Sequence, residues 1–138
     1  MNAETVRARL QALGLPAGGY VLHSSASLVL RGVLDEAGDV DVVCGADAWR
    51  VALGLVEAGA ATLDLGRHDL RVSVGDDAEL YDGWFGEPGD AVVARAELVA
   101  GVPCAPLAEV VAFKERLGRP KDHVHLAAIR RFQERQRG

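Results

Sequence analysis

Cysteine, long apolar runs and repeated segments are scarce or missing in this chain. The two cysteines, Cys44 and Cys104, do not have the spacing of a metal site, and one pair makes no disulfide framework. Both stand among apolar residues, which indicates buried free thiols. No run approaches the roughly 18 apolar residues of a membrane span, and the N-terminus lacks the apolar core of a signal peptide. We therefore expect a cytoplasmic protein that has no membrane partner.

An overall basic charge is missing as well. The chain has 15 Lys and Arg against 20 Asp and Glu, which gives a net charge of −5. This charge is uneven, because residues 114–138 hold eight basic and three acidic side chains, whereas residues 1–113 hold seven and seventeen. The acidic balance argues against a general nucleic-acid binder. The basic tail suits either local contacts with phosphate or a solvated helix face.

What the chain does contain is an alternation of helical and strand-like segments. Its 138 residues suit one domain with its own core, and no linker divides them. The order helix, strand, helix, strand, helix and then hairpins predicts one α/β (α+β) domain over residues 1–138, with a mixed sheet flanked by helices. Helices are expected to begin near Thr5, Ser24 or Ser25, Asp47, Pro106 and Pro120; strands are expected over 20–22 and 39–44 and, as an antiparallel meander, over 61–65, 70–74 and 78–81.

The strand over 39–44 carries two acids. Asp39 and Asp41 alternate with Val40, Val42 and Val43, and such alternation places both carboxylates on one face of a strand. Two neighbouring carboxylates repel each other unless a cation lies between them. Mg²⁺ suits such a pair, because it prefers carboxylate oxygens and bridges substrate phosphates. The structural alternative is a polar strand face that meets solvent.

Two hydroxyls, those of Ser24 and Ser25, directly follow the strand over 20–22. At the start of a helix they can bond to free backbone N–H groups, and the same place favours phosphate. A helix cap and a phosphate contact therefore both fit these residues.

In this arrangement the chain resembles the small bacterial nucleotidyltransferases of the DNA polymerase β-type superfamily. Members carry Gly-Ser or Gly-Gly at the end of a strand, then a short helix, and then Asp-x-Asp or Asp-x-Glu in the next strand. Here Ser24-Ser25 stands at the first motif and Asp39-Val40-Asp41 at the second. Serine replaces glycine at position 24, where a glycine allows the backbone to approach a triphosphate closely.

The basic tail extends this resemblance over residues 20–130. Nucleotidyltransferase-like proteins of the abortive-infection toxin and antibiotic-modifying kind show a lysine-bearing helix, an Arg-x-Lys-Asp turn and a closing helix. Lys114 and the turn Arg119-Pro120-Lys121-Asp122 stand at these places. The resemblance implies that Lys114 and Lys121 bind phosphate, whereas each lysine alone also fits a solvated surface. Asp122 is interpreted as structural, bonding to the helix start or orienting Arg119.

The resemblance further implies a third carboxylate on a later strand. Glu79 lies inside a predicted strand between Ala78 and Leu80, whereas Asp69 and Asp82 lie at strand ends. Glu79 is therefore the predicted third acid, with an exposed strand glutamate as the alternative. The implied site residues are, for catalysis and metal, Asp39, Asp41 and Glu79, and, for phosphate, Ser24, Ser25, Lys114 and Lys121, with Mg²⁺ or Mn²⁺ as cofactor.

Three histidines and one aromatic loop complete the candidates. His68 is predicted to be a turn residue, and His123 and His125 to lie on the surface, because two residues of separation make them diverge on a helix. The loop Asp82-Gly-Trp-Phe-Gly86 either covers a ligand or folds its aromatic side chains onto the core.

The implied function is transfer of a nucleoside monophosphate from a nucleoside triphosphate to an unknown acceptor, which is a small molecule, a protein or RNA. One alternative is a catalytically silent binding module of the same fold, acting as a toxin–antitoxin-type partner. Another is a structural domain whose acidic strand faces water. A homo-oligomer or a protein partner is compatible with each of them.

Overall fold

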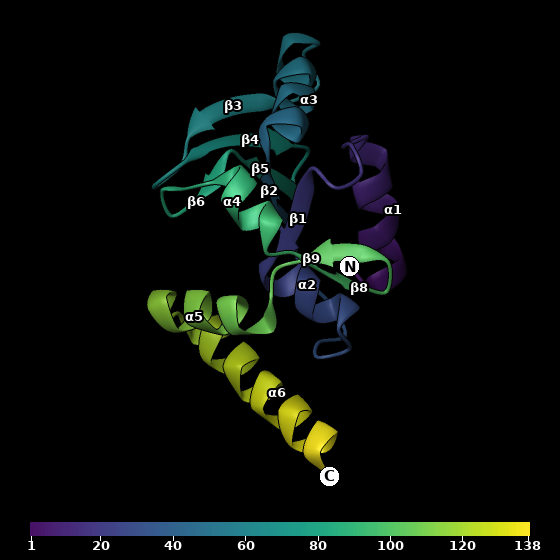
Figure 1. Cartoon of the computed structure of the whole chain (residues 1–138), viewed down its shortest axis with the longest axis vertical. Helices are drawn as coiled ribbons and strands as arrows, with labels where there is room; N and C mark the ends of the chain where they lie inside the picture. The colour runs from purple at the N-terminus through teal and green to yellow at the C-terminus, as the bar shows by residue number, and fades with distance from the viewer.

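A seven-stranded mixed sheet forms the centre of the computed structural model, which describes residues 1–138 (Figure 1). Its strands are β1 (Tyr20–His23), β2 (Val40–Cys44), β3 (Thr62–Leu65), β4 (Leu70–Val74), β5 (Ala78–Tyr81), β8 (Glu97–Val99) and β9 (Val102–Cys104). A small hairpin adds β6 (Gly83–Trp84) and β7 (Glu87–Pro88). The helices are α1 (Ala3–Leu13), α2 (Ser24–Leu30), α3 (Ala46–Glu57), α4 (Gly89–Ala94), α5 (Leu107–Leu117) and α6 (Pro120–Arg137). None of these helices has both the length and the apolar character needed to cross a membrane.

The strands lie in the order β3-β4-β5-β2-β1-β9-β8. The predicted antiparallel meander is confirmed, since β3 pairs antiparallel with β4 and β4 with β5. Parallel pairing of β5 with β2 then joins the meander to the N-terminal hairpin-like pair β2 and β1. The predicted fold class, an α/β domain with a mixed sheet flanked by helices, is confirmed.

One face of the sheet is apolar along the central strands. The side chains of Leu22, Val42 and Leu80 lie side by side across β1, β2 and β5, and all three are buried. Helices α1 and α3 contribute to this core, so that the face excludes water and supports the strands. The core residues from these two helices are Val6, Leu10, Leu13, Ala48 and Ala52.

The other face is apolar over only part of its width. Val21 and Val43, which lie opposite each other on β1 and β2, are buried with Val92 of α4, Val110 of α5 and Ile129 of α6. Beyond this cluster the same face becomes polar along β2, β5 and β4. The polar positions are Asp41, Glu79, Tyr81 and Arg71. A sheet face without a helical cover can hold such side chains in contact with solvent.

Several helix starts differ from the predictions. The helix α1 begins at Ala3, because the Asn2 side chain accepts the N–H of Thr5 and caps it; Thr5 is therefore not the cap. The helix α3 is preceded by Gly45, and Asp47 lies in its first turn, where a carboxylate complements the helix dipole. Pro106 is the residue before α5, whereas Pro120 does begin α6 as predicted.

Several short elements were not predicted. The hairpin of β8 and β9 turns at Ala100 and Gly101, whose φ angles of 51° and 82° suit a two-residue hairpin loop. Its two strands have three residues each, too few for an alternating pattern to appear. The apolar stretch 91–94 belongs to α4, whose six residues are likewise too short for a helical pattern to appear.

Candidate active site

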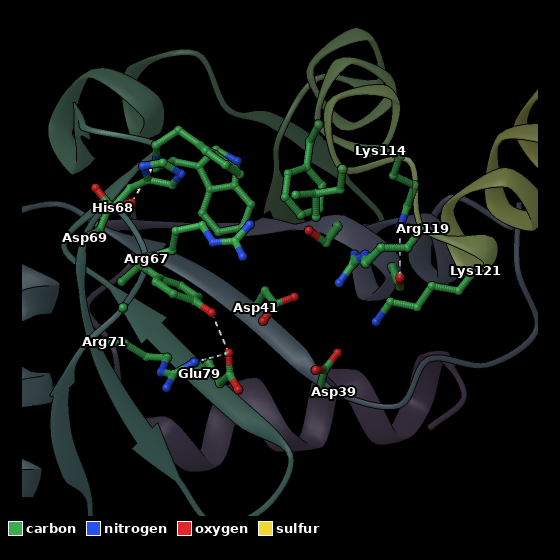
Figure 2. A pocket seen from close by; sticks show the side chains of 18 residues that line it. Asp39, Asp41, Arg67, His68, Asp69, Arg71, Glu79, Lys114, Arg119 and Lys121 are labelled. Carbon is green, nitrogen blue, oxygen red and sulfur yellow. Dashed lines mark hydrogen bonds and ion pairs between the residues drawn. The ribbon is translucent and has the colours of Figure 1, made fainter.

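A cavity of about 450 Å³ opens over the polar part of the sheet (Figure 2). All seven residues that the sequence implicated line this one cavity, although they come from five separate segments of the chain. They are Ser24, Ser25, Asp39, Asp41, Glu79, Lys114 and Lys121. The antiparallel pairing of β1 with β2 brings the serines beside the aspartates, and the packing of α5 and α6 adds the lysines.

The floor of the cavity carries the three predicted acids. Asp41 lies directly opposite Glu79 in the parallel pair β2 and β5, and Asp39, the residue before β2, lines the same cavity. Asp41 is half-buried. Its burial, and then the charges of Asp39 and Glu79, raise the pKa of Asp41 to about 7, against the opposing effect of Lys121 and Lys114. Asp41 is therefore a carboxylate that the fold leaves short of positive charge.

Glu79 already has partners within the protein. The Tyr81 hydroxyl donates a hydrogen bond to Glu79 Oε2, and Arg71 Nη1 lies 3.9 Å from the same oxygen. Burial, and then this hydrogen bond, raise the pKa of Tyr81. Nowhere do three His, Cys, Asp or Glu side chains converge as one metal-ligand group. Glu79 thus shares the cavity with Asp39 and Asp41 without joining them as a ligand set.

Three basic side chains, Lys114, Arg119 and Lys121, line one side of the cavity. Lys114 is deeply buried, with only 1% of its side chain exposed. Its Nζ lies 3.3 Å from Ser25 Oγ and 3.4 Å from Oδ1 of the fully buried Asp122. Burial lowers the pKa of Lys114, and the charge of Asp122 opposes this effect. The expectation that Lys114 lies on a solvated surface is excluded, because its ammonium group is paired inside the protein.

Asp122 also organises the turn before α6. It accepts hydrogen bonds from the backbone N–H of Arg119 at 3.0 Å and from Arg119 Nε at 2.7 Å. Burial alone would raise the pKa of Asp122, but the bonds from Arg119 and the charge of Lys114 lower it to about 2. The prediction that Asp122 is structural and orients Arg119 is confirmed.

Ser24 has an unusual backbone and an unpaired hydroxyl. Its φ of 59° falls in the left-handed region, which favours glycine, the residue that the resembling family carries here. Only 4% of Ser24 is exposed, and its buried Oγ has no hydrogen-bond partner. The predicted capping role belongs instead to His23, whose Nδ1 accepts the N–H of Ser24 at 2.9 Å. Burial lowers the pKa of His23 to about 3, so this imidazole is neutral.

Ser25 lies between a lysine and a histidine. Its Oγ is 3.4 Å from His125 Nδ1, in addition to its contact with Lys114. The prediction that His125 lies on the surface is wrong, because this position of α6 faces α2 and is half-buried. Burial, and then the charge of Lys114, lower the pKa of His125. His123 is exposed, as predicted.

The residues that line the cavity on the side opposite to the lysines were not predicted from the sequence. The bend between β3 and β4 places Arg67, His68 and Asp69 at the cavity, and β4 adds Arg71 (Figure 2). His68 is a turn residue, as predicted, and its ring lies 4.8 Å from that of Phe85. The only signal for this side of the cavity was an Arg-His pair between two strand-like runs. Arg67 and Arg71, together with Lys114, Arg119 and Lys121, give the cavity five basic side chains. The cavity has four acids, Asp39, Asp41, Asp69 and Glu79, so it is slightly basic although the whole chain is acidic.

An aromatic group closes the third side of the cavity. Trp84 stacks on His23 with ring centroids 4.4 Å apart and lies 5.0 Å from Phe113 of α5. Phe85 lies beside them, and Asp69 accepts the backbone N–H of Phe85 at 2.8 Å. The loop 82–86 therefore does both things that the sequence left open, since Trp84 packs on buried His23 and both aromatic side chains line the cavity.

Neither a protein-family model nor a curated protein matches this chain in sequence.

Proposed function

We propose that the chain is a nucleotidyltransferase, which moves a nucleoside monophosphate from a nucleoside triphosphate to an acceptor hydroxyl in the cytoplasm. The observation that carries this proposal is one cavity in which the unpaired carboxylates of Asp39 and Asp41 face the unpaired hydroxyl of Ser24 and several basic side chains. The order of the two motifs, which resembles DNA polymerase β-type nucleotidyltransferases, supports the same reaction class.

Asp39 and Asp41 are the residues that would hold a divalent cation, Mg²⁺ or Mn²⁺. The fit rests on the two carboxylates, which line one cavity and make no hydrogen bond or ion pair within the protein, while Asp41 lies opposite a third acid, Glu79. The raised pKa of Asp41 agrees with this arrangement and would fall beside a cation. Two carboxylates are enough for Mg²⁺, because it keeps several waters and takes its other ligands from substrate phosphates. When bound, such an ion supplies charge neutralisation at the reacting phosphate.

The serines and lysines would bind the triphosphate. A buried hydroxyl without a partner costs about 1 to 3 kcal/mol, so the unpaired Oγ of Ser24 is suited to a phosphate oxygen. Ser25 and Lys114 lie beside it, and Lys121 projects into the same side of the cavity (Figure 2). These groups would stabilise the charge that develops on the pyrophosphate as it leaves.

Glu79 would position the attacking hydroxyl. It lies opposite Asp41 in the sheet, on the side away from the lysines, and Tyr81 and Arg71 fix its carboxylate. A group held in this way can orient an acceptor, and orientation alone contributes large rate factors. The expected consequence is that Glu79→Gln retains nucleotide binding and loses most transfer.

Two observations favour a second candidate, a catalytically silent nucleotide-binding module that serves a protein partner. Serine occupies the left-handed position 24, and Glu79 is bonded to Tyr81 and Arg71 rather than gathered with Asp39 and Asp41. Such a module would bind Mg²⁺ and nucleotide without releasing pyrophosphate. A purely structural domain would bind neither.

The test is incubation of the protein with labelled nucleoside triphosphates and Mg²⁺. Pyrophosphate release and labelled acceptors, including the protein itself, are measured beside calorimetric nucleotide binding. The double variant Asp39→Asn, Asp41→Asn should lose binding and turnover. The matched double variant Asp35→Asn, Glu36→Gln removes two exposed acids outside the cavity and should lose neither. Binding without turnover selects the silent module, and equal binding by both double variants refutes the cation site.

A further inference from the structure

The cavity has basic side chains on two opposite sides. Figure 2 shows Arg67 and Arg119 directed toward each other from opposite sides of Asp41. Lys114, Arg119 and Lys121 form one side, together with the two serines, whereas Arg67 and Arg71 form the other. One triphosphate on the serine side would leave the second basic side without an anion.

On this second side, Arg67 is the cation that has no hydrogen-bond or ion-pair partner within the protein. Arg71 is bonded to Asp64 through two hydrogen bonds of 3.0 and 3.1 Å and lies near Glu79. On the opposite side, Asp122 forms ion pairs with both Lys114 and Arg119. Arg67 makes no hydrogen bond and no ion pair, and its side chain projects into the cavity. A free guanidinium group matches phosphate oxygens in a bidentate geometry.

The reaction geometry assigns this side to the acceptor. In an in-line displacement the attacking oxygen approaches phosphorus from the side opposite to the leaving group. Pyrophosphate held by Ser24, Ser25 and the lysines would leave toward α5 and α6, so the acceptor enters from β4 and β5. Glu79 stands at this entrance, between Asp41 of β2 and the strand that carries Arg71.

We propose that the acceptor is a small molecule that carries a phosphate group near its attacking hydroxyl, and that Arg67 binds this phosphate. The inference rests on the proposed nucleotidyl transfer. A small phosphate ester fits better than a polymer, because the 17 acids of residues 1–113 repel an extended polyanion. A cationic acceptor would meet Arg67 as a like charge.

The transfer then balances without another reactant. The acceptor oxygen forms a bond to the α-phosphorus, and the bond from that phosphorus to the oxygen bridging the β-phosphate breaks. Pyrophosphate leaves with the electron pair of that bond. The hydroxyl proton passes to solvent through the carboxylate of Glu79.

The experiment measures acceptor binding without turnover. Protein saturated with Mg²⁺ and an α,β-methylene nucleoside triphosphate is titrated calorimetrically with ribose 5-phosphate, inorganic phosphate and ribose. Ribose 5-phosphate and phosphate should bind, and ribose should bind at least about tenfold more weakly, as expected for loss of a charge-assisted hydrogen bond. Arg67→Gln should weaken both phosphate-bearing probes about tenfold and leave the affinity for the nucleotide unchanged.

Arg130→Gln is the matched control, because Arg130 is exposed on α6 and lies outside the cavity. This variant loses the same charge and should retain wild-type affinity for every probe. The inference is overturned if ribose binds as tightly as ribose 5-phosphate, if neither phosphate-bearing probe binds, or if Arg67→Gln weakens the nucleotide instead. Those results would contradict the acceptor site but not the proposed nucleotidyl transfer. Absence of any nucleotide binding by the wild type overturns the proposed function, and this inference falls with it.

Discussion

The carboxyl groups of Asp122 and Asp41 have pKa values that are shifted in opposite directions within one small domain. Asp122 is fully buried, yet Arg119 and Lys114 hold its pKa at about 2. Burial, and then the charges of Asp39 and Glu79, raise the pKa of Asp41 to about 7, although Asp41 keeps more contact with solvent than Asp122 does. The fold thus completes the first charge cluster with its own cations and leaves the second incomplete.

Burial acts to raise the pKa of both carboxylates, so the neighbouring charges decide whether the pKa ends low or high. A buried charge that is fully paired contributes to a fixed geometry, here the turn that presents Arg119 and Lys121. A carboxylate that remains short of positive charge makes the folded protein less stable than it would otherwise be, and such cost is common where a ligand binds. The first two predictions below test the two sides of this comparison, and the next two test the residues that would bind phosphate beside Asp41.

The largest effect is expected at the paired cluster. Asp122→Asn leaves the ammonium group of Lys114 buried without a countercharge, and breaking a buried pair in this way costs about 3 to 5 kcal/mol. Urea denaturation should show this loss in the free energy of unfolding. The double variant Lys114→Met, Asp122→Asn removes both charges and should recover much of it. A loss below about 1 kcal/mol in Asp122→Asn contradicts the structural role.

Replacement of Asp41 is expected to raise the free energy of unfolding, whereas replacement of Asp122 lowers it. Its folded pKa of about 7 exceeds the ordinary value of 3.8, so between these pH values the folded state holds a proton that the unfolded state has released. The contribution of Asp41 to the free energy of unfolding therefore falls as pH rises from about 4 to about 7, opposite in sign to the contribution of His23, whose pKa is lowered to about 3. Asp41→Asn should remove this decline and raise stability at pH 8 by about 1 to 3 kcal/mol. Denaturation at several pH values checks it, with Asp35→Asn, an exposed acid, as the control.

Lys121 provides a cleaner test of phosphate binding than Lys114. It is exposed and has no hydrogen bond or ion pair to lose, whereas removal of Lys114 disturbs the buried pair. Lys121→Met should weaken nucleotide binding by about 1 to 3 kcal/mol, the range for a charge-assisted hydrogen bond, and leave stability unchanged. Calorimetry with Mg²⁺ and nucleotide measures the first effect. Wild-type affinity in this variant would mean that Lys121 is a solvated surface residue that does not contact phosphate.

Ser24 should give the smallest change. Glycine adopts a φ of 59° without the strain that serine bears, and Ser24→Gly also removes an unpaired buried hydroxyl. The variant should be more stable by about 1 kcal/mol in the absence of nucleotide. Its nucleotide affinity should fall slightly if the hydroxyl contacts phosphate. A less stable Ser24→Gly protein would mean that Ser24 Oγ has a structural partner.

The sequence predicted one half of the cavity and not the other, for a physical reason. Asp39, Asp41 and the two serines lie in local patterns, an alternating strand and a strand-to-helix turn, and the tail lysines lie in a second motif. Arg67 and Phe113 have no such pattern, and Trp84 was placed only in a loop that either covers a ligand or folds onto the core. They reach the cavity through pairing of distant strands and packing of α5, which only the three-dimensional fold supplies.

Pairing partners were equally invisible in the sequence. The tail motif marked Lys114 and Asp122, but nothing in it showed that they bond to each other inside the protein. His125 was assigned to the surface because helical spacing separates it from His123, and spacing says nothing of what packs against each face. Long, strongly periodic elements were predicted well, whereas the short α4, β8 and β9 were not.

The central claim is that the carboxylates of Asp39 and Asp41 form an incomplete cluster that a divalent cation completes. The direct measurement is a carbon-13 NMR titration of the Asp41 carboxyl group with and without Mg²⁺. We expect a pKa near 7 without the ion, and a decrease of at least about one unit with saturating Mg²⁺ and an unreactive nucleotide analogue, as an adjacent opposite charge requires. Asp122 should keep a pKa of about 2 in both samples. An Asp41 pKa that is unchanged by Mg²⁺ and nucleotide would contradict the claim.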